Sequence, residues 1–165
     1  MSLPTSAPLY YQVGVFGLIR SKGSYLLIDP ERLLLPGAAQ LPGLLMDSAS
    51  GAGLAEVGLR RALLSQVGLA VGPLMLVGSF AVRLPEGDSR LSLIFGSEYV
   101  SGILNPSAEV RRAEWHPPVQ LRQLGAPEWL FSAIEEYQLS GNATEDQDER
   151  PRKAGFRSLL GRRGQ

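Results

Sequence analysis

The sequence predicts a mixed α/β (α+β) domain in which one β-sheet lies between helices, and two kinds of pattern indicate this. Apolar runs of strand length, rich in β-branched and aromatic residues, alternate with turns formed by Gly, Pro, Ser and Asp. The segment 54–67 instead carries apolar residues at helical spacing. The length of 165 residues fits one compact domain. The order strand, strand, helix, hairpin, strand, helix then predicts a mixed sheet flanked by helices.

The first half of the chain is expected to contain a hairpin, an irregular segment and a helix. Residues 13–19 and 25–28 are the predicted strands of the hairpin. The prolines within residues 33–46 forbid a helix there and leave short extended pieces between bends. A helix is predicted over residues 54–67, ended by Gly68 in a left-handed conformation. Its expected apolar face comprises Ala55, Leu59, Leu63, Leu64 and Val67.

The second half is expected to continue the sheet and to end in a helix. Residues 74–84 and 90–100 are predicted strands joined by a turn. A further short strand is predicted over 111–115, a short turn or helix over 119–124, and the last helix over 127–139, with Pro127 in its first turn.

A change in composition near Ser140 divides the chain. Residues 1–139 are predicted to form the domain, and residues 140–165 a polar and basic C-terminal tail, which we expect to be flexible. Within the tail, Phe156, Leu159 and Leu160 alternate with arginine and lysine, a pattern that also suits binding to a membrane surface, RNA or a partner groove.

Composition narrows the function classes. The 16 basic residues balance the 16 acidic ones, so no overall field favours nucleic acid. The absence of cysteine rules out disulfides, thiolate metal sites and a cysteine nucleophile. No signal-peptide pattern and no apolar run of roughly 20 residues is present, so a cytoplasmic protein is expected. A homodimer stays open.

Several strings, in order, resemble the Nudix (MutT-like) hydrolase family. They are the hairpin strands at 13–19 and 25–28, the turn Leu41-Pro42-Gly43-Leu44, the helix end at residues 61–69, and residues 109–115. The resemblance covers residues 12–139 and implies a Nudix-type mixed sheet sandwiched between helices. It also implies hydrolysis of nucleoside diphosphates linked to another group, with Mg²⁺ as cofactor.

The family motif explains why Mg²⁺ is doubtful in this chain. Breaking a diphosphate calls for divalent metal, and Mg²⁺ prefers carboxylate oxygens, which the family supplies as glutamates on one helix. Gly43, Arg61, Leu63 and Gly68 match the motif, and the family's arginine helps to hold the helix and its glutamates. Its glutamate positions carry other residues: Ala62, Ser65, Gln66 and, upstream, either Ser50 or Gly53 according to the end from which the motif is counted.

Other charged residues are candidates to replace the missing ligands. Glu56 and Asp47 are the acids nearest the motif, although a first-turn glutamate also suits the helix dipole and Asp47 also suits a turn. Arg60, Glu109 and Glu114 are candidates for the ligand side, against the alternative of solvated positions.

Three hypotheses follow, and they leave open whether the chain is an enzyme. The preferred one is a degenerate Nudix domain, catalytically impaired, that binds a nucleotide-like ligand or a protein partner. The second is an active pyrophosphohydrolase with relocated acidic ligands. The third is an interaction protein that acts through its basic C-terminal tail.

Overall fold

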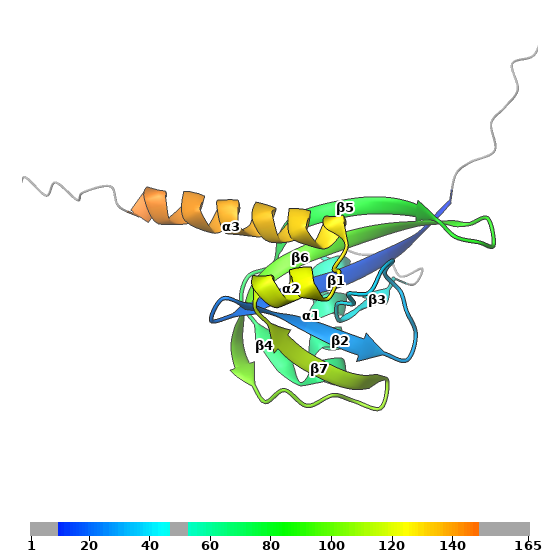
Figure 1. Cartoon of the computed structure of the whole chain (residues 1–165), viewed down its shortest axis with the longest axis horizontal. Coiled ribbons are helices and arrows are strands. Elements are labelled where there is room, and N and C mark those ends of the chain that lie inside the picture. The colour runs from blue at the N-terminus through cyan, green and yellow to red at the C-terminus, as the bar shows by residue number, and fades with distance from the viewer. Residues whose placement is uncertain (1–9, 47–52, 149–165) are drawn as a thin grey trace, which may run out of the picture.

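The computed structural model describes residues 10–46 and 53–148, which form a curled mixed sheet with helices on both faces (Figure 1). The strands within these residues are β1 (Tyr11–Ser21), β2 (Ser24–Pro30), β3 (Gly43–Leu45), β4 (Leu69–Val71), β5 (Met75–Arg83), β6 (Ser89–Gly102) and β7 (Val110–His116). The helices are α1 (Leu54–Val67), α2 (Pro118–Gln123) and α3 (Glu128–Asp148). The mixed sheet between helices that the sequence predicts is therefore confirmed.

Strand β1 occupies the centre of the sheet and separates from β2 along most of its length. It pairs in parallel with β6, from Tyr11 opposite Ser89 to Arg20 opposite Glu98. Its pairing with β2 is confined to the hairpin end, whereas its middle residues Gly14–Phe16 pair with β3. The short strand β3 thus fills part of the gap between β1 and β2, and this splay opens the sheet beside α1.

Each face of the sheet carries its own core, because successive strand residues point to opposite faces. Val15 and Ile19 of β1 pack with α1. Phe16 and Leu18, their neighbours in sequence, pack with α2 and α3 on the other face. Fully burying each such side chain contributes roughly 1.5–3 kcal/mol, so both helical layers are held by the same strand.

Helix α1 has the predicted bounds and the predicted end. Gly68 adopts the left-handed conformation (φ 76°), and its N–H bonds the carbonyls at the end of the helix. Leu59, Leu63 and Val67 are buried. The expectation that Leu64 extends the apolar face was wrong. Leu64 is 57% exposed, because the sheet covers the side of the helix that carries Leu63 and Val67 and not the side that carries Leu64.

Helix α3 is longer than the predicted 127–139. It begins at Glu128 and runs to Asp148, and Figure 1 shows its C-terminal part projecting beyond the sheet. No proline interrupts the chain between Pro127 and Pro151, so nothing in the sequence forces an earlier end. The division into a domain of residues 1–139 and a flexible tail stays a prediction, and Phe156, Leu159 and Leu160 lie outside the described residues.

A charged contact fixes the middle of α3 to the sheet. Arg20 of β1 forms an ion pair with Glu98 of β6, and Tyr137 donates a hydrogen bond of 3.0 Å to the same carboxylate. The guanidinium also lies 4.8 Å from the centre of the Tyr137 ring. Gly96 makes room for this ring, which a Cβ there would meet at 2.6 Å.

Within the described residues, no helix is long and apolar enough to cross a membrane.

Candidate functional site

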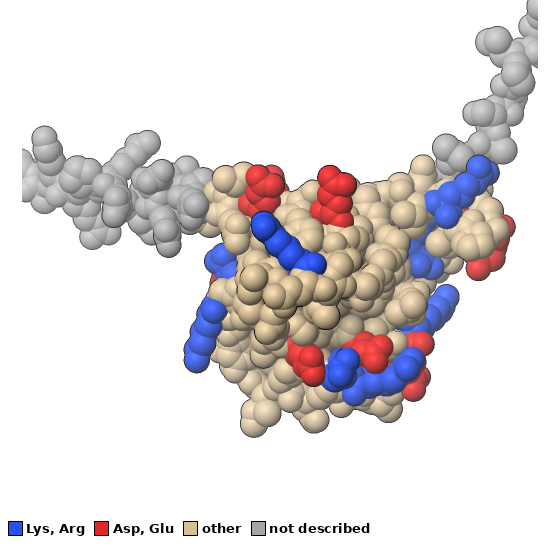
Figure 2. Space-filling view, in the orientation of Figure 1, with Lys and Arg blue, Asp and Glu red and all other residues tan. Residues whose placement is uncertain are grey.

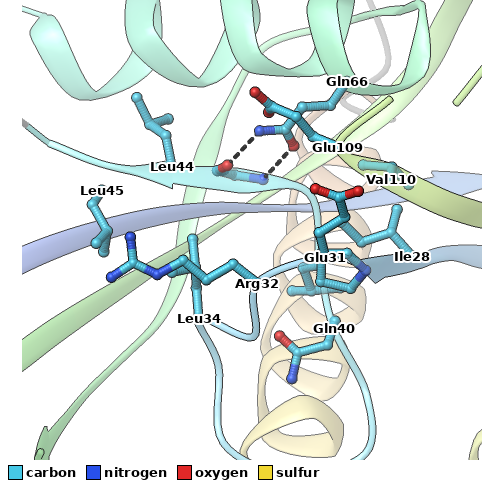
Figure 3. Close-up of a pocket in the computed structure, with 13 residues that line it drawn as sticks. Ile28, Glu31, Arg32, Leu34, Gln40, Leu44, Leu45, Gln66, Glu109 and Val110 are labelled. Carbon is cyan, nitrogen blue, oxygen red and sulfur yellow. Dashed lines mark hydrogen bonds between the residues drawn. The ribbon is translucent and has the colours of Figure 1, made fainter. Parts of the chain in front are cut away.

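A cavity of about 430 Å³ lies where β1 and β2 separate, next to the C-terminal end of α1 (Figure 3). Its floor is apolar and includes Ile28 of β2, Leu44 of β3 and Val110 of β7. Its polar lining comes from Glu31, Arg32, Gln40, Gln66 and Glu109. The volume is in the range of small-molecule sites.

The side chain of Gln66 is locked onto β3 at the edge of this cavity. Its Nε2 donates a hydrogen bond of 2.7 Å to the carbonyl of Gly43, and its Oε1 accepts one of 3.1 Å from the Gly43 N–H. The amide therefore pairs with Gly43 as a neighbouring strand would. A glutamate could accept from the N–H but could not donate to the carbonyl, so this double contact requires an amide.

Gly43 cannot be replaced without moving β1. A Cβ at this position would overlap the carbonyl oxygen of Val15 on the paired strand. The next residue, Leu44, stands where the family has its second glycine, and its side chain lies 3.5 Å from the position of a Cβ on Gly58 of α1. Leu44 therefore fills the space between β3 and α1.

The other motif positions on α1 also lack metal ligands. Ala62 is buried, and Ser65 is exposed and donates its hydroxyl hydrogen back to the Ala62 carbonyl. Arg61 is exposed, whereas Leu63 is fully buried and helps to hold the helix on the sheet. In the described part of the chain no three His, Cys, Asp or Glu residues are placed to share a metal ion. The residues present on α1 do not fit Mg²⁺.

Two carboxylates line the cavity from the other side. Glu31 follows β2 and Glu109 precedes β7, and the Glu31 N–H donates a hydrogen bond of 3.0 Å to the Glu109 carbonyl. A register shift after Asp29, which brings Pro30 opposite Val110, places the two residues together. Figure 3 shows the Glu31 carboxylate between Gln66 and Gln40, and the Glu109 side chain next to Gln66.

The sequence indicated Glu109 but missed Glu31 and Arg32. Glu31 lies in a turn-like string, Asp29-Pro30-Glu31-Arg32, which gives no sign that it faces Glu109. The two residues come together through the pairing of β2 with β7, and the shift in register cannot be deduced from either strand alone.

The remaining sequence candidates do not line this cavity. Glu114 lines a second cavity of about 410 Å³ on the α2 face, with His116 and Arg112 at 3.6 Å from its carboxylate. Arg60 donates hydrogen bonds of 2.9 and 3.0 Å to the Val71 and Gly72 carbonyls.

The two acids nearest the motif do not contribute to the cavity lining either. Glu56 is exposed in the first turn of α1, the position that the helix dipole favours. Asp47 lies outside the described residues. The structure thus brings Gly43, Gln66 and Glu109 together and separates them from Glu56, Arg60 and Glu114.

Gln40 holds the segment that closes the cavity opposite α1. Its side chain is 4% exposed, donates to the carbonyls of Leu35 and Gly37, and accepts from the Leu35 N–H. Its backbone carbonyl accepts a hydrogen bond of 3.0 Å from Ile28 of β2. Both amide side chains of the lining are therefore bonded to backbone groups.

The charged side chains outside the cavity form no field of one sign on the face shown in Figure 2. Acidic and basic side chains are interspersed there near β2 and β7. One such contact is the exposed ion pair of Arg112 and Glu114. Such pairs are screened by solvent, so they steer a ligand weakly.

Comparisons with known proteins identify the fold. No family model and no curated protein matches the chain. A Nudix hydrolase from Nitrosomonas europaea superposes with a TM-score of 0.62 at 19% identity, over 79% of this chain and 90% of that one. The E. coli ORF135 protein gives 0.60 at 17%, over 82% and 94%. The MutT protein from Methanosarcina mazei Go1 gives 0.61 at 21%, over 82% and 99%. The chain therefore has the Nudix-type fold that its sequence predicts.

Proposed function

We propose that this Nudix-type domain binds a small molecule in the cavity beside α1 and does not catalyse metal-dependent hydrolysis of diphosphates. The observation that carries the proposal is the double hydrogen bond between Gln66 and Gly43. It uses the position of a family glutamate to fasten the helix to β3. A fold supports many functions, so the site must decide the activity.

The chemical requirements of diphosphate hydrolysis support this proposal. Diphosphate cleavage at neutral pH needs a divalent ion to neutralise the phosphate oxygens and to activate water. Ala62, Ser65 and Gln66 offer no carboxylate to such an ion. Between a nucleotide-like ligand and a protein partner, a cavity of about 430 Å³ favours a small molecule.

A hydrolysis assay with a metal-binding control tests the proposal. ADP-ribose, UDP-glucose and diadenosine diphosphate would be incubated with the full chain and Mg²⁺ or Mn²⁺. We expect no release of product above the protein-free rate and no shift of the melting temperature with Mn²⁺. The double substitution Ser65→Glu, Gln66→Glu is the matched control, since it restores two carboxylates and should introduce a Mn²⁺-dependent shift. Turnover by the natural chain that a chelator abolishes would overturn the proposal.

One observation favours the second candidate, an active hydrolase with relocated ligands. Glu31 and Glu109 place two carboxylates in the same cavity as Gln66, which stands where the family has a glutamate. If these residues bound a catalytic ion, Glu109→Gln would reduce turnover by orders of magnitude. Glu56→Gln, on the exposed side of α1, would leave it unchanged. The third hypothesis concerns the basic tail, which lies outside the described residues and stays a prediction.

A further inference from the structure

The lining of the cavity beside α1 also specifies the charge of its occupant. Its volume of about 430 Å³ is bounded by apolar side chains over most of the floor. These are Ile28, Leu34, Leu41, Leu44, Leu45 and Val110. Such a surface is stabilised by contact with an apolar body, at roughly 25 cal/mol per Å² removed from water. The occupant therefore needs an aliphatic or aromatic portion.

The polar groups of the lining differ in whether they are already bonded. The side-chain amides of Gln66 and Gln40 are bonded to backbone groups of Gly43, Leu35 and Gly37. In the part of the chain that the structure describes, the carboxylates of Glu31 and Glu109 have no hydrogen bond and no ion pair. The free side-chain groups on that side of the cavity are therefore acceptors, which a ligand meets by donating N–H.

The net charge of the lining also favours a ligand with a positive charge. Two carboxylates and the single guanidinium of Arg32 leave one net negative charge. Figure 3 shows the Arg32 guanidinium pointing towards Leu45, away from Glu31 and Glu109. A free diphosphate would bring further negative charge beside two carboxylates, and like charges at close range repel. An ammonium group would instead neutralise them.

We propose that the cavity takes an organic ammonium compound, with its apolar body on the Ile28, Leu44 and Val110 floor and its N–H groups on the Glu31 and Glu109 carboxylates. This inference rests on the proposed binding function of the same cavity. The proposed ligand is therefore a cation and not a polyanionic nucleotide.

Three ligands that share a six-carbon chain and are positive, neutral or negative test the proposal. Hexylammonium, hexanol and hexanoate would be titrated into the ¹⁵N-labelled full chain, with ADP and pyrophosphate as anionic probes. We expect hexylammonium to shift the amide signals of cavity residues and to bind roughly two- to fivefold more tightly than hexanol, as for exposed ion pairs. Glu31→Gln with Glu109→Gln should remove this preference, and Glu56→Gln, the same charge change outside the cavity, should retain it.

The possible failures separate the two proposals. Tighter binding of hexanoate, ADP or pyrophosphate than of hexylammonium would overturn the inference and leave the binding function standing. A preference for hexylammonium that survives the double substitution would also overturn it, since the carboxylates would then not be responsible. If none of the five compounds shifts any cavity signal up to millimolar concentration, the proposed binding function itself fails.

Discussion

Glutamates on the two sides of the sheet are used in different ways. Glu98, on the α3 side, accepts from both Arg20 and Tyr137 and so joins two strands to a helix. Glu31 and Glu109, on the α1 side, have no bonded partner within the described residues, although a backbone hydrogen bond fixes their spacing. A carboxylate that is already bonded stabilises the fold, whereas an unbonded one beside a cavity is available to a ligand.

The largest expected difference is between removing Glu98 and removing Glu109. Glu98→Ala leaves Arg20 without its ion pair and Tyr137 without its acceptor, so we expect a loss of about 2 kcal/mol, reduced from the value for buried pairs because both side chains are partly exposed. Glu109→Ala should change stability by less than about 0.5 kcal/mol. Urea unfolding of both variants measures this. Equal losses would show that the two carboxylates do not differ in role.

A smaller effect is expected where the motif helix meets β3. Gln66→Glu removes the donor to the Gly43 carbonyl and places a carboxylate oxygen against it, which should cost about 1.5 kcal/mol. Ser65→Glu, next to it but exposed, is the control and should be nearly neutral. The measurement is the urea midpoint of each variant. A Gln66→Glu variant as stable as the natural chain would show that the double hydrogen bond contributes nothing.

The smallest effect is a dependence on alkaline pH. Burial and the hydrogen bond to Glu98 raise the pKa of Tyr137 well above its ordinary value of 10.0. A raised folded pKa contributes stability that is present below pH 10 and is lost as pH rises towards the folded pKa, by about 1 kcal/mol at pH 11. Unfolding at pH 9 and pH 11 tests this.

Substituting the tyrosines identifies the group responsible. Tyr137→Phe should reduce the loss of stability between pH 9 and pH 11, whereas Tyr10→Phe, at an exposed position, should not. If Tyr137→Phe lost as much stability over this interval as the natural chain, the titrating group would lie elsewhere.

Most elements could be predicted from the sequence, including the short β7 and α2, but the three-residue strands β3 and β4 could not. Helix α1 and the two hairpins follow from apolar periodicity and from the glycines that end them, so their positions agree with the structure within a few residues. Strands β3 and β4 are three residues long, too short to show a period. The sequence predicts too early an end for α3 because the residues after Ser140 are polar, although helices also tolerate polar residues.

The sequence predicts Gly43, Gln66 and Glu109 as site residues, but not the contacts that bring them together. The motif identified Gln66 as a substitution for glutamate, but not that its amide would bond both backbone groups of Gly43. That contact depends on how close β3 lies to α1, which is a tertiary distance. The pairing of Glu31 with Glu109 depends on a strand register that neither segment specifies alone.

The short connection across the splayed strands fixes the length of the chain at this point. The Gln40 carbonyl bonds the Ile28 N–H of β2, and the Pro42 carbonyl bonds the Gly17 N–H of β1 at 2.9 Å. The single residue between them, Leu41, must therefore span the gap between the two strands. An insertion or deletion here would move one strand relative to the other and change the shape of the cavity. Libraries that aim to change the ligand should therefore keep the number of residues between Gln40 and Pro42 unchanged.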